Sequence, residues 1–301
     1  MFKCLLCASI AEPQLVSSSL RDDTSNMLNI VRCLSCGHVQ VTPLPDAGLN
    51  SLFYDTDQQS LSLISTPDFE LIKQKTSTDT LRRVKWLHHC QPDPTARVLD
   101  IGCGYGFFIN QLTLDGYQAC GMDISLARME FAKKHQAGEF IRGLIDASFV
   151  EQYRGQYQVI TLFHVLEHVY EPDEFLRLCF ELLSPGGQLL IEVPNLNDEL
   201  LWQNEKYRSF YWQRAHVSYF DPSRLNLLIQ RTCGRSAPIK GVQRYGIYNL
   251  LQWVQDGGPQ LSNPSFEVDE PSLMRLEQLY REDRERALTS DTLIVQVQKS
   301  A

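Results

Sequence analysis

Short apolar runs alternate with amphipathic stretches from residue 97 onward. The runs contain few charges and end at Gly, Pro, Asp or Asn, as buried strands of a parallel sheet do. They cover residues 97–101, 118–124, 139–145, 157–163, 188–193, 239–248 and 291–298. The last run alternates apolar and polar side chains, which is typical of an antiparallel strand. The pattern predicts an α/β fold with one seven-stranded sheet.

Apolar residues at helical spacing predict three longer helices outside and between these strands. These helices cover residues 69–89, 223–232 and 270–288. Asp46 is expected to cap a short helix that ends near Tyr54, and residues 58–67 are expected to form a loop.

Composition limits the class of protein. The chain has 301 residues, 43% hydrophobic and 21% charged, which is enough for one large core with appended segments. A net charge of −8 disfavours a broad surface for nucleic acid. No apolar run approaches the roughly 20 residues of a membrane span, and no secretory signal is recognisable. The nine cysteines are therefore expected to be reduced thiols in the cytoplasm.

Two Cys-x-x-Cys pairs lie near the N-terminus. They are formed by Cys4 and Cys7 and by Cys33 and Cys36, with Gly37 directly after the second pair. Two such turns can complete a tetrahedral zinc site made only of protein thiolates, so the metal would be structural. Four unrelated thiols, or a redox pair, are the alternative.

The segment around these cysteines, residues 1–45, is expected to form a zinc-ribbon-like module. Its three cations are balanced by three acids, which argues against a nucleic-acid reader and favours a lid or docking module. His38, just after the second pair, is expected to be a surface histidine and not a ligand.

A glycine turn follows the strand at 97–101. Gly102, Gly104 and Gly106 occupy every second position, and glycines allow a ligand to approach the backbone closely. A dinucleotide turn needs its third glycine one position later, where Phe107 stands. Asp100 would repel a pyrophosphate but would suit a ligand with ammonium and sulfonium charges.

The order Asp-x-Gly-x-Gly-x-Gly resembles motif I of class I S-adenosylmethionine (SAM) methyltransferases. Asp123 ends the second strand, where an acid can accept both hydroxyls of a ribose, although it could instead cap the next helix. Leu166-Glu167-His168 and the turn Leu183–Gly187 resemble further segments of this family. The resemblance covers residues 93–235.

This resemblance implies a Rossmann-like sheet that binds SAM. Asp146 and Ala147, after the third strand, would meet the adenine, with a plain turn as the alternative. The cofactor contacts that it implies come from Asp100, Gly102, Cys103, Gly104, Gly106, Asp123, Ile124, Asp146, Ala147, Phe163 and His164.

The acceptor is expected to bind to residues 196–220, because this segment is rich in aromatic residues and arginines, which suit a sugar or nucleotide-sugar. The alternative is an ordinary lid helix whose aromatic rings pack in the core. Residues 216–220 resemble the His-x-x-Tyr-Phe segment of glycan and deoxysugar methyltransferases. Gln213 and Ala215 stand where the carbon methyltransferases of that group have Tyr and Glu, which favours transfer to oxygen or nitrogen. His216 is the first candidate for the catalytic base and His164 the second. A buried core histidine is the alternative for each.

The expected organisation is a zinc-ribbon-like module (1–45), a helical linker (46–92) and a methyltransferase domain (93–301). The leading hypothesis is a cytoplasmic SAM-dependent methyltransferase for a sugar, sugar nucleotide, glycan or related small molecule, without nucleic-acid or membrane partners. The alternatives are a methyltransferase for RNA or protein that uses the ribbon for docking, a non-catalytic zinc-ribbon binding protein on this scaffold, and a dinucleotide oxidoreductase.

Overall fold

The computed structural model describes residues 2–23, 27–45, 69–259 and 270–300. The chain forms two compact units, each built from separate stretches. The first unit comprises Met1–Leu44, Glu192–Leu228 and Ala237–Val295, and the second comprises Pro45–Ile191, Ile229–Ser236 and Gln296–Ala301. The helix expected between Asp46 and Tyr54 and the loop expected at 58–67 lie outside the described residues.

Four parallel strands form the framework of the second unit, in the spatial order β7-β4-β5-β6. These strands are β4 (Arg97–Ile101), β5 (Gln118–Asp123), β6 (Glu139–Arg142) and β7 (Tyr157–Phe163). The first four predicted strands are thus confirmed. β6 ends at Arg142, earlier than the expected residue 145.

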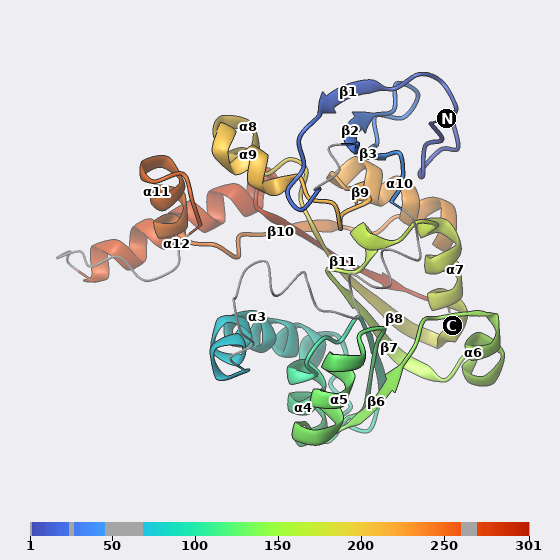
Figure 1. Ribbon diagram of the computed structural model, residues 1–301. Coiled ribbons are helices and arrows are strands. Elements are labelled where there is room, and N and C mark those ends of the chain that lie inside the picture. Colours follow the sequence, from blue (N-terminus) through green and yellow to red (C-terminus); the bar gives the residue numbers. More distant parts are fainter. Residues whose placement is uncertain (1, 24–26, 46–68, 260–269, 301) are drawn as a thin grey trace. The chain divides into compact units, whose positions relative to one another are not determined.

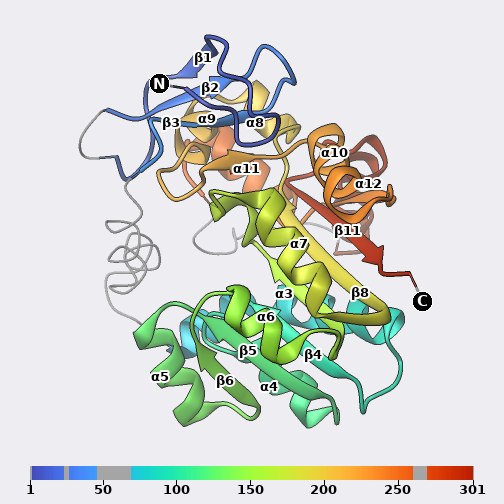
Figure 2. The same cartoon turned by 90° about the vertical axis from the view of Figure 1, so that its right-hand side faces the viewer.

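Helices cover both faces of these strands. They are α3 (Phe69–Cys90), α4 (Phe107–Leu114), α5 (Leu126–His135), α6 (Ala147–Tyr153), the 3₁₀ turn η1 (Leu166–His168) and α7 (Pro172–Leu182). α3, α4 and α5 lie on one side of the strands (Figure 1), and α6 and α7 lie on the other, which faces the viewer in Figure 2. The predicted helix at 69–89 is confirmed as α3. Buried side chains such as Leu99, Ile109 and Leu112 fill the space between sheet and helices.

The full sheet has seven strands in the order β10-β11-β8-β7-β4-β5-β6, which confirms the predicted fold class. The remaining strands are β8 (Leu183–Pro194), β10 (Ile239–Val242) and β11 (Thr292–Gln298), and β10 pairs with β11 in antiparallel fashion. The division between the two units falls within β8 and β11.

A second, four-stranded antiparallel sheet lies in the first unit, in the order β1-β2-β3-β9. Its strands are β1 (Gln14–Ser17), β2 (Asn29–Arg32), β3 (Val39–Thr42) and β9 (Ser218–Tyr219). The helices that belong to this unit or begin in it are α8 (Glu199–Gln203), α9 (Glu205–Tyr211), α10 (Pro222–Cys233), α11 (Ile247–Gln255) and α12 (Glu270–Ala287). β3 of the N-terminal segment thus pairs with a strand from far along the chain.

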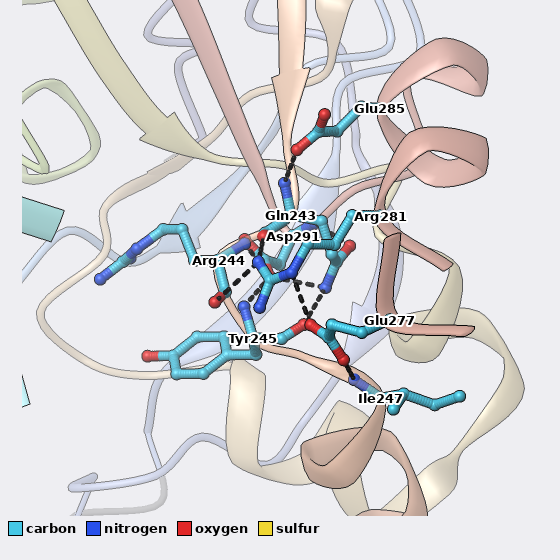
Figure 3. A network of polar contacts seen from close by, with 8 residues as sticks. All are labelled: Gln243, Arg244, Tyr245, Ile247, Glu277, Arg281, Glu285 and Asp291. Atoms are coloured by element: carbon cyan, nitrogen blue, oxygen red, sulfur yellow. Dashed lines mark hydrogen bonds and ion pairs between the residues drawn. The ribbon is translucent and has the colours of Figure 1, made fainter. Parts of the chain in front are cut away.

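One predicted strand is wrong in its second half. The run at 239–248 stays extended only as far as Val242, and residues from Ile247 onward form α11. The reason is the carboxylate of Asp291, which accepts the backbone N–H groups of Arg244 and Tyr245, each at 3.0 Å, so that these groups cannot continue a strand ladder (Figure 3).

The same polar network attaches α12 to this loop. Glu285 accepts the backbone N–H of Gln243 at 2.9 Å, and Glu277 accepts that of Ile247 at 2.8 Å. Arg281 bridges Glu277 and the carbonyl of Gln243 (Figure 3).

Within the described ranges, none of the helices is long and apolar enough to cross a bilayer.

Candidate active site and metal centre

The glycine turn lies between β4 and α4. All three of its glycines have positive φ angles, between 56° and 78°. A Cβ on Gly102 would come within 2.5 Å of Val165, and one on Gly106 within 2.6 Å of Phe140. A Cβ on Gly104 would meet no heavy atom of the described residues within 4 Å. Gly102 and Gly106 therefore let Val165 and Phe140 pack closely against the turn. Gly104 instead borders open space that a ligand can occupy.

Asp100 is buried in β4 directly before this turn. The hydroxyl of Thr161, its register partner on β7, donates to Oδ1 of Asp100 at 2.6 Å. Burial raises the pKa of Asp100 to about 7, although the bond from Thr161 and the positive charge of Arg83 oppose that shift. The carboxyl group therefore gains or loses its proton near neutral pH, and an approaching cation would favour the charged form.

Asp123 is buried at the end of β5, next to the turn. Its Oδ2 accepts the backbone N–H of Gly104 at 3.0 Å, and its Oδ1 accepts that of Ser125 at 2.9 Å. Ser125 is the residue that caps α5, so the alternative role of Asp123 as a simple helix cap is not observed. Two carboxylate oxygens offer about four acceptor positions, which leaves capacity for two further donors.

Other residues of the expected cofactor site lie around the same strand ends. Ile124 follows β5, and its carbonyl accepts from the Arg142 side chain at 3.1 Å. Asp146 is exposed and caps α6 by accepting the backbone N–H of Phe149 at 2.8 Å, while Ala147 begins that helix.

Cys103 and Phe163 contribute packing at this edge. The Cys103 side chain lies against Gly121 of β5, where a Cβ would come within 2.7 Å of its sulfur. Phe163, the last residue of β7, contacts Phe108 of α4 edge to face at 5.2 Å between ring centroids. Both side chains are buried, so contact with a ligand would involve their backbone or the rim of their side chains.

His164 follows β7 in a left-handed backbone conformation, with φ of 58°. Such a conformation is uncommon for a residue with a side chain, and it is concentrated at functional sites. The Nδ1 atom of His164 lies 3.2 Å from Oε1 of Glu167, which is buried in the following turn. The His-x-x-Glu spacing of the 3₁₀ turn thus fixes the imidazole.

His216 is buried in the first unit, just before β9. The side-chain nitrogen of Gln213 lies 3.0 Å from its Nε2 and 3.2 Å from its Nδ1. The hydroxyl of Tyr219 lies 3.1 Å from the carbonyl of Gln213 and closes this loop. Inside the first unit, His216 therefore has Gln213 as a polar neighbour and Tyr219 as an aromatic one.

Most aromatic residues of segment 196–220 belong to the core of the first unit. The buried rings are Tyr207, Tyr211, Trp212, Tyr219 and Phe220. Trp202 is the exposed exception, and its Nε1 donates to the carbonyl of Leu196 at 2.9 Å. These positions agree with the packing alternative for most of the rings and not with an open aromatic acceptor surface.

The four predicted metal ligands come together in the first unit. Sγ of Cys4 lies 3.6 Å from that of Cys36, Sγ of Cys7 lies 3.7 Å from that of Cys33, and all four sulfurs lie within 4.8 Å of one another. A tetrahedron with Zn–S bonds of about 2.3 Å has edges of about 3.8 Å, so the sulfurs have room for one tetrahedral ion. All nine cysteines, each in a described range, are free thiols.

His38 differs from the expectation. It is buried rather than exposed, its Nε2 lies 3.2 Å from Oγ of Ser218, and its ring packs against Phe220. Ser218 of β9 and Phe220 cover it, and both lie far along the chain from the cysteine pair beside His38.

Sequence reasoning also missed two residues next to Asp100. Thr161 appeared only as one apolar-run residue of β7, and its contact depends on strand register. Arg83 of α3 places its guanidinium 4.7 Å from the ring centre of Phe163, and its charge acts on Asp100. An arginine on the polar side of a helix carries no signal that it faces a strand end far along the chain.

This sheet order, with a glycine turn and acids at the ends of two adjacent parallel strands, defines an α/β protein of the methyltransferase type. The chain belongs to the family described as a methyltransferase domain, whose model matches residues 76–232, just over half of the 301 residues.

Curated relatives include the ubiquinone biosynthesis O-methyltransferases of Pseudomonas aeruginosa and Pseudomonas putida. The first is 32% identical over 119 residues, which is 38% of this chain and 51% of the relative. The second is 30% identical over the same length, with the same shares covered. The chain thus spans about half the length of the curated relatives it matches.

Solved structures share the fold. The magnesium protoporphyrin IX methyltransferase of Synechocystis PCC 6803, with bound SAH, superposes with a TM-score of 0.53 at 16% identity, over 85% of this chain and 100% of that one. A SAM-dependent methyltransferase of Archaeoglobus fulgidus gives 0.51 at 19% identity, over 77% and 100%.

Proposed function

We propose that this chain is a SAM-dependent methyltransferase that transfers a methyl group to an oxygen or nitrogen atom of a small-molecule acceptor. The observation that carries the proposal is the open space at Gly104, bordered by the turn and by the carboxylate of Asp123. Family membership and the relatives' names, which include an O-methyltransferase, support the same reaction class.

The residues of the second unit suit each part of SAM. Asp100 offers a buried carboxylate for the ammonium group, and Arg83 offers a positive charge for the carboxylate. Asp123 retains acceptor capacity for the ribose hydroxyls. Asp146 and Ala147, at the start of α6, are proposed to border the adenine.

The list of proposed cofactor contacts is completed by Gly102, Cys103, Gly106, Ile124, Phe163 and His164.

SAM supplies an activated methyl group when bound, so the protein needs to hold the acceptor in line with that group and to accept the acceptor's proton. His216 and His164 are the two proposed groups for that proton, because a histidine has a pKa near working pH.

For the acceptor, we propose a small molecule. The segment 216–220 supports a sugar, sugar nucleotide or glycan, whereas the relatives' names point to ubiquinone biosynthesis, so both classes belong in the test. The net charge of −8 speaks against a nucleic-acid acceptor. Nine free thiols suit the reducing cytoplasm, where we propose that the protein acts.

We also propose a structural zinc ion bound by Cys4, Cys7, Cys33 and Cys36. The sulfur spacings support a tetrahedral ion, and four protein thiolates leave no coordination position for a substrate. In this proposal residues 1–45 form the zinc-bearing module, 46–92 the linker and 93–301 the methyltransferase domain.

Calorimetry with SAM and with S-adenosylhomocysteine tests the cofactor assignment directly. We expect one site per chain for either ligand in the zinc-loaded protein. Transfer of a labelled methyl group is then measured on a panel of sugars, sugar nucleotides, phenols and amines. A folded, zinc-loaded protein that binds neither ligand would exclude the proposed activity.

A further inference from the structure

The two cysteine turns share one backbone pattern. In the first turn Ala8 donates its N–H to the carbonyl of Cys4 at 3.0 Å, and in the second Gly37 donates to the carbonyl of Cys33 at 2.8 Å. The residue that closes each turn has a positive φ, 57° at Ala8 and 78° at Gly37. The turns therefore differ mainly in what holds each of them in place.

The second turn is the loop of a β-hairpin. β2 ends at Arg32, directly before Cys33, and β3 begins at Val39. The N–H of Cys33 donates to the carbonyl of His38 at 2.8 Å, which continues the ladder toward the turn. Two paired strands thus hold the second turn.

The first turn has no such strands, because β1 is the first strand of the described chain and begins only at Gln14. The side-chain amide of Gln40 takes the place of a strand. Its Oε1 accepts the N–H of Leu5 at 2.7 Å, and its Nε2 donates to the carbonyl of Lys3 at 3.1 Å. These two bonds lie on either side of Cys4.

An amide suits this contact because the N–H of Leu5 needs an acceptor and the carbonyl of Lys3 needs a donor. Gln40 is buried, with 1% of its surface exposed, and its backbone in β3 pairs with Ser218 of β9. Gln40 therefore attaches Cys4 to the sheet by contacts that do not require the metal.

Arg224 holds the second turn from the side of α10. Its Nε donates to the carbonyl of Cys36 at 2.9 Å. A Cβ on Gly37 would collide with its guanidinium, so glycine at this position permits the close approach. The backbone N–H and Nη1 of Arg224 bond to Asp221 at 2.9 Å and 3.3 Å, which fixes the side chain at the start of α10.

The short stretch of residues 216–224 is thus attached to both cysteine turns. β9 pairs with Gln40, whose side chain holds the first turn, and Arg224 bonds to the second. The N–H of Val41 also donates to the carbonyl of Val217 at 3.1 Å. Four thiolates from two turns can surround one ion only if both turns keep their places. The contacts that place the sulfurs are therefore also the contacts that attach this stretch.

We propose that Gln40 and Arg224 are positioning residues of the zinc site, and that through them the bound ion stabilises residues 216–224 against the N-terminal sheet. The proposal rests on the proposed zinc ion. Groups that orient metal ligands from outside the coordination sphere typically change metal affinity by about 10–100-fold. The coupling is reciprocal, because contacts that favour zinc binding are themselves favoured by bound zinc.

Competition with a chelator, on the full chain, measures zinc affinity and tests the positioning role. Gln40→Met keeps the length of the side chain without its two hydrogen bonds, and Arg224→Met removes the donor to Cys36. We expect each variant to bind one zinc ion at least about tenfold more weakly than wild type. Gln14→Met, at an exposed position of β1, and Arg286→Met, at an exposed position of α12, are matched controls and should bind as wild type does.

A contact that stabilised the fold equally with and without metal would leave this affinity unchanged. Wild-type affinity in either folded variant would therefore overturn the positioning role of that residue. If Gln40→Met does not fold, Arg224→Met, at a half-buried position, decides.

Amide hydrogen exchange tests the effect on residues 216–224. The N–H of Leu196 donates to the carbonyl of Phe220 at 2.8 Å and reports on this stretch from outside the N-terminal sheet. Removal of zinc by a chelator should speed exchange at Leu196 at least tenfold by rough estimate, while the N–H groups of β4 keep their rates. An unchanged rate at Leu196 would overturn the stabilisation by zinc.

A wild-type chain that binds no zinc would refute the zinc site itself, and the proposal with it. That result differs from a loaded wild type whose variants bind equally well, which refutes the positioning roles alone. Both results are independent of whether SAM binds.

Discussion

The hydroxyl of Thr161 on β7 donates a hydrogen bond to Oδ1 of Asp100 on β4 across 2.6 Å. The two residues are register partners in parallel strands, so the bond depends on the alignment of both strands. Burial raises the pKa of the Asp100 carboxyl group to about 7, and the bond from Thr161 partly opposes this shift. The fold thus keeps the Asp100 carboxyl group, which destabilises the folded protein when it is charged, next to the glycine turn.

Asp100→Asn should stabilise the ligand-free protein and abolish SAM binding. The folded pKa of Asp100 lies above its ordinary value of 3.8, so the folded state binds the proton more tightly and loses stability as pH rises from about 4 to about 7. Asn keeps an oxygen for Thr161 without the charge. Its advantage should grow by about 2–3 kcal/mol between pH 5 and pH 8.

Urea unfolding of wild type and Asp100→Asn at several pH values measures this difference. Asp283→Asn, at an exposed position of α12, is the control and should show no such trend. A constant difference across this pH range would mean that Asp100 does not titrate as described.

Gly104→Ala and Gly106→Ala should separate ligand binding from folding. Both positions have positive φ, which costs about 1 kcal/mol for Ala. The Gly104 methyl group enters open space and should reduce SAM affinity at least tenfold in a folded protein. The Gly106 methyl group meets Phe140 and should lower the melting temperature much more.

Gly155→Ala is the matched control, because its φ is +68° and a Cβ there would also meet no described heavy atom within 4 Å. It should show the backbone cost without a change in SAM affinity. Calorimetry and thermal unfolding of the three variants provide the comparison. Equal SAM affinity in Gly104→Ala and Gly155→Ala would contradict the location of the cofactor.

Asp123→Ala should abolish detectable SAM binding while the protein still folds. The variant loses the ribose acceptor and leaves the N–H groups of Gly104 and Ser125 without their carboxylate, which costs about 1–3 kcal/mol. Calorimetry measures affinity and circular dichroism checks the fold. Unchanged affinity would reject the ribose assignment.

Removal of the metal should unfold the N-terminal module. We expect one zinc ion per chain by metal analysis, and loss of that ion in Cys33→Ser, because three thiolates do not complete the tetrahedron. Cys90→Ser, at a cysteine outside the cluster, should retain the metal. Full zinc content in Cys33→Ser would disprove the assignment of Cys33 as a ligand.

Local sequence was sufficient for much of the architecture. Buried parallel strands need apolar runs, and the run at 157–163 matches β7 with the same limits. Where backbone groups found other partners the limits shifted, as after Val242, where the carboxylate of Asp291 takes N–H groups that a strand would have used.

The aromatic segment illustrates the opposite case. Tyr207, Trp212 and Tyr219 are compatible in sequence with either an acceptor surface or a core, because aromatic rings serve both. Only the packing of the first unit decided that these rings are buried.

The sequence by itself determined the α/β fold class, the glycine turn with its two acids and the grouping of four cysteines, because each follows from residues close together along the chain. The tertiary structure alone decided that Thr161 and Arg83 act on Asp100 and that the Gln40 amide holds the chain on both sides of Cys4. Those contacts join residues from distant parts of the chain, and a hydrogen bond's direction depends on which donor the fold brings to which acceptor.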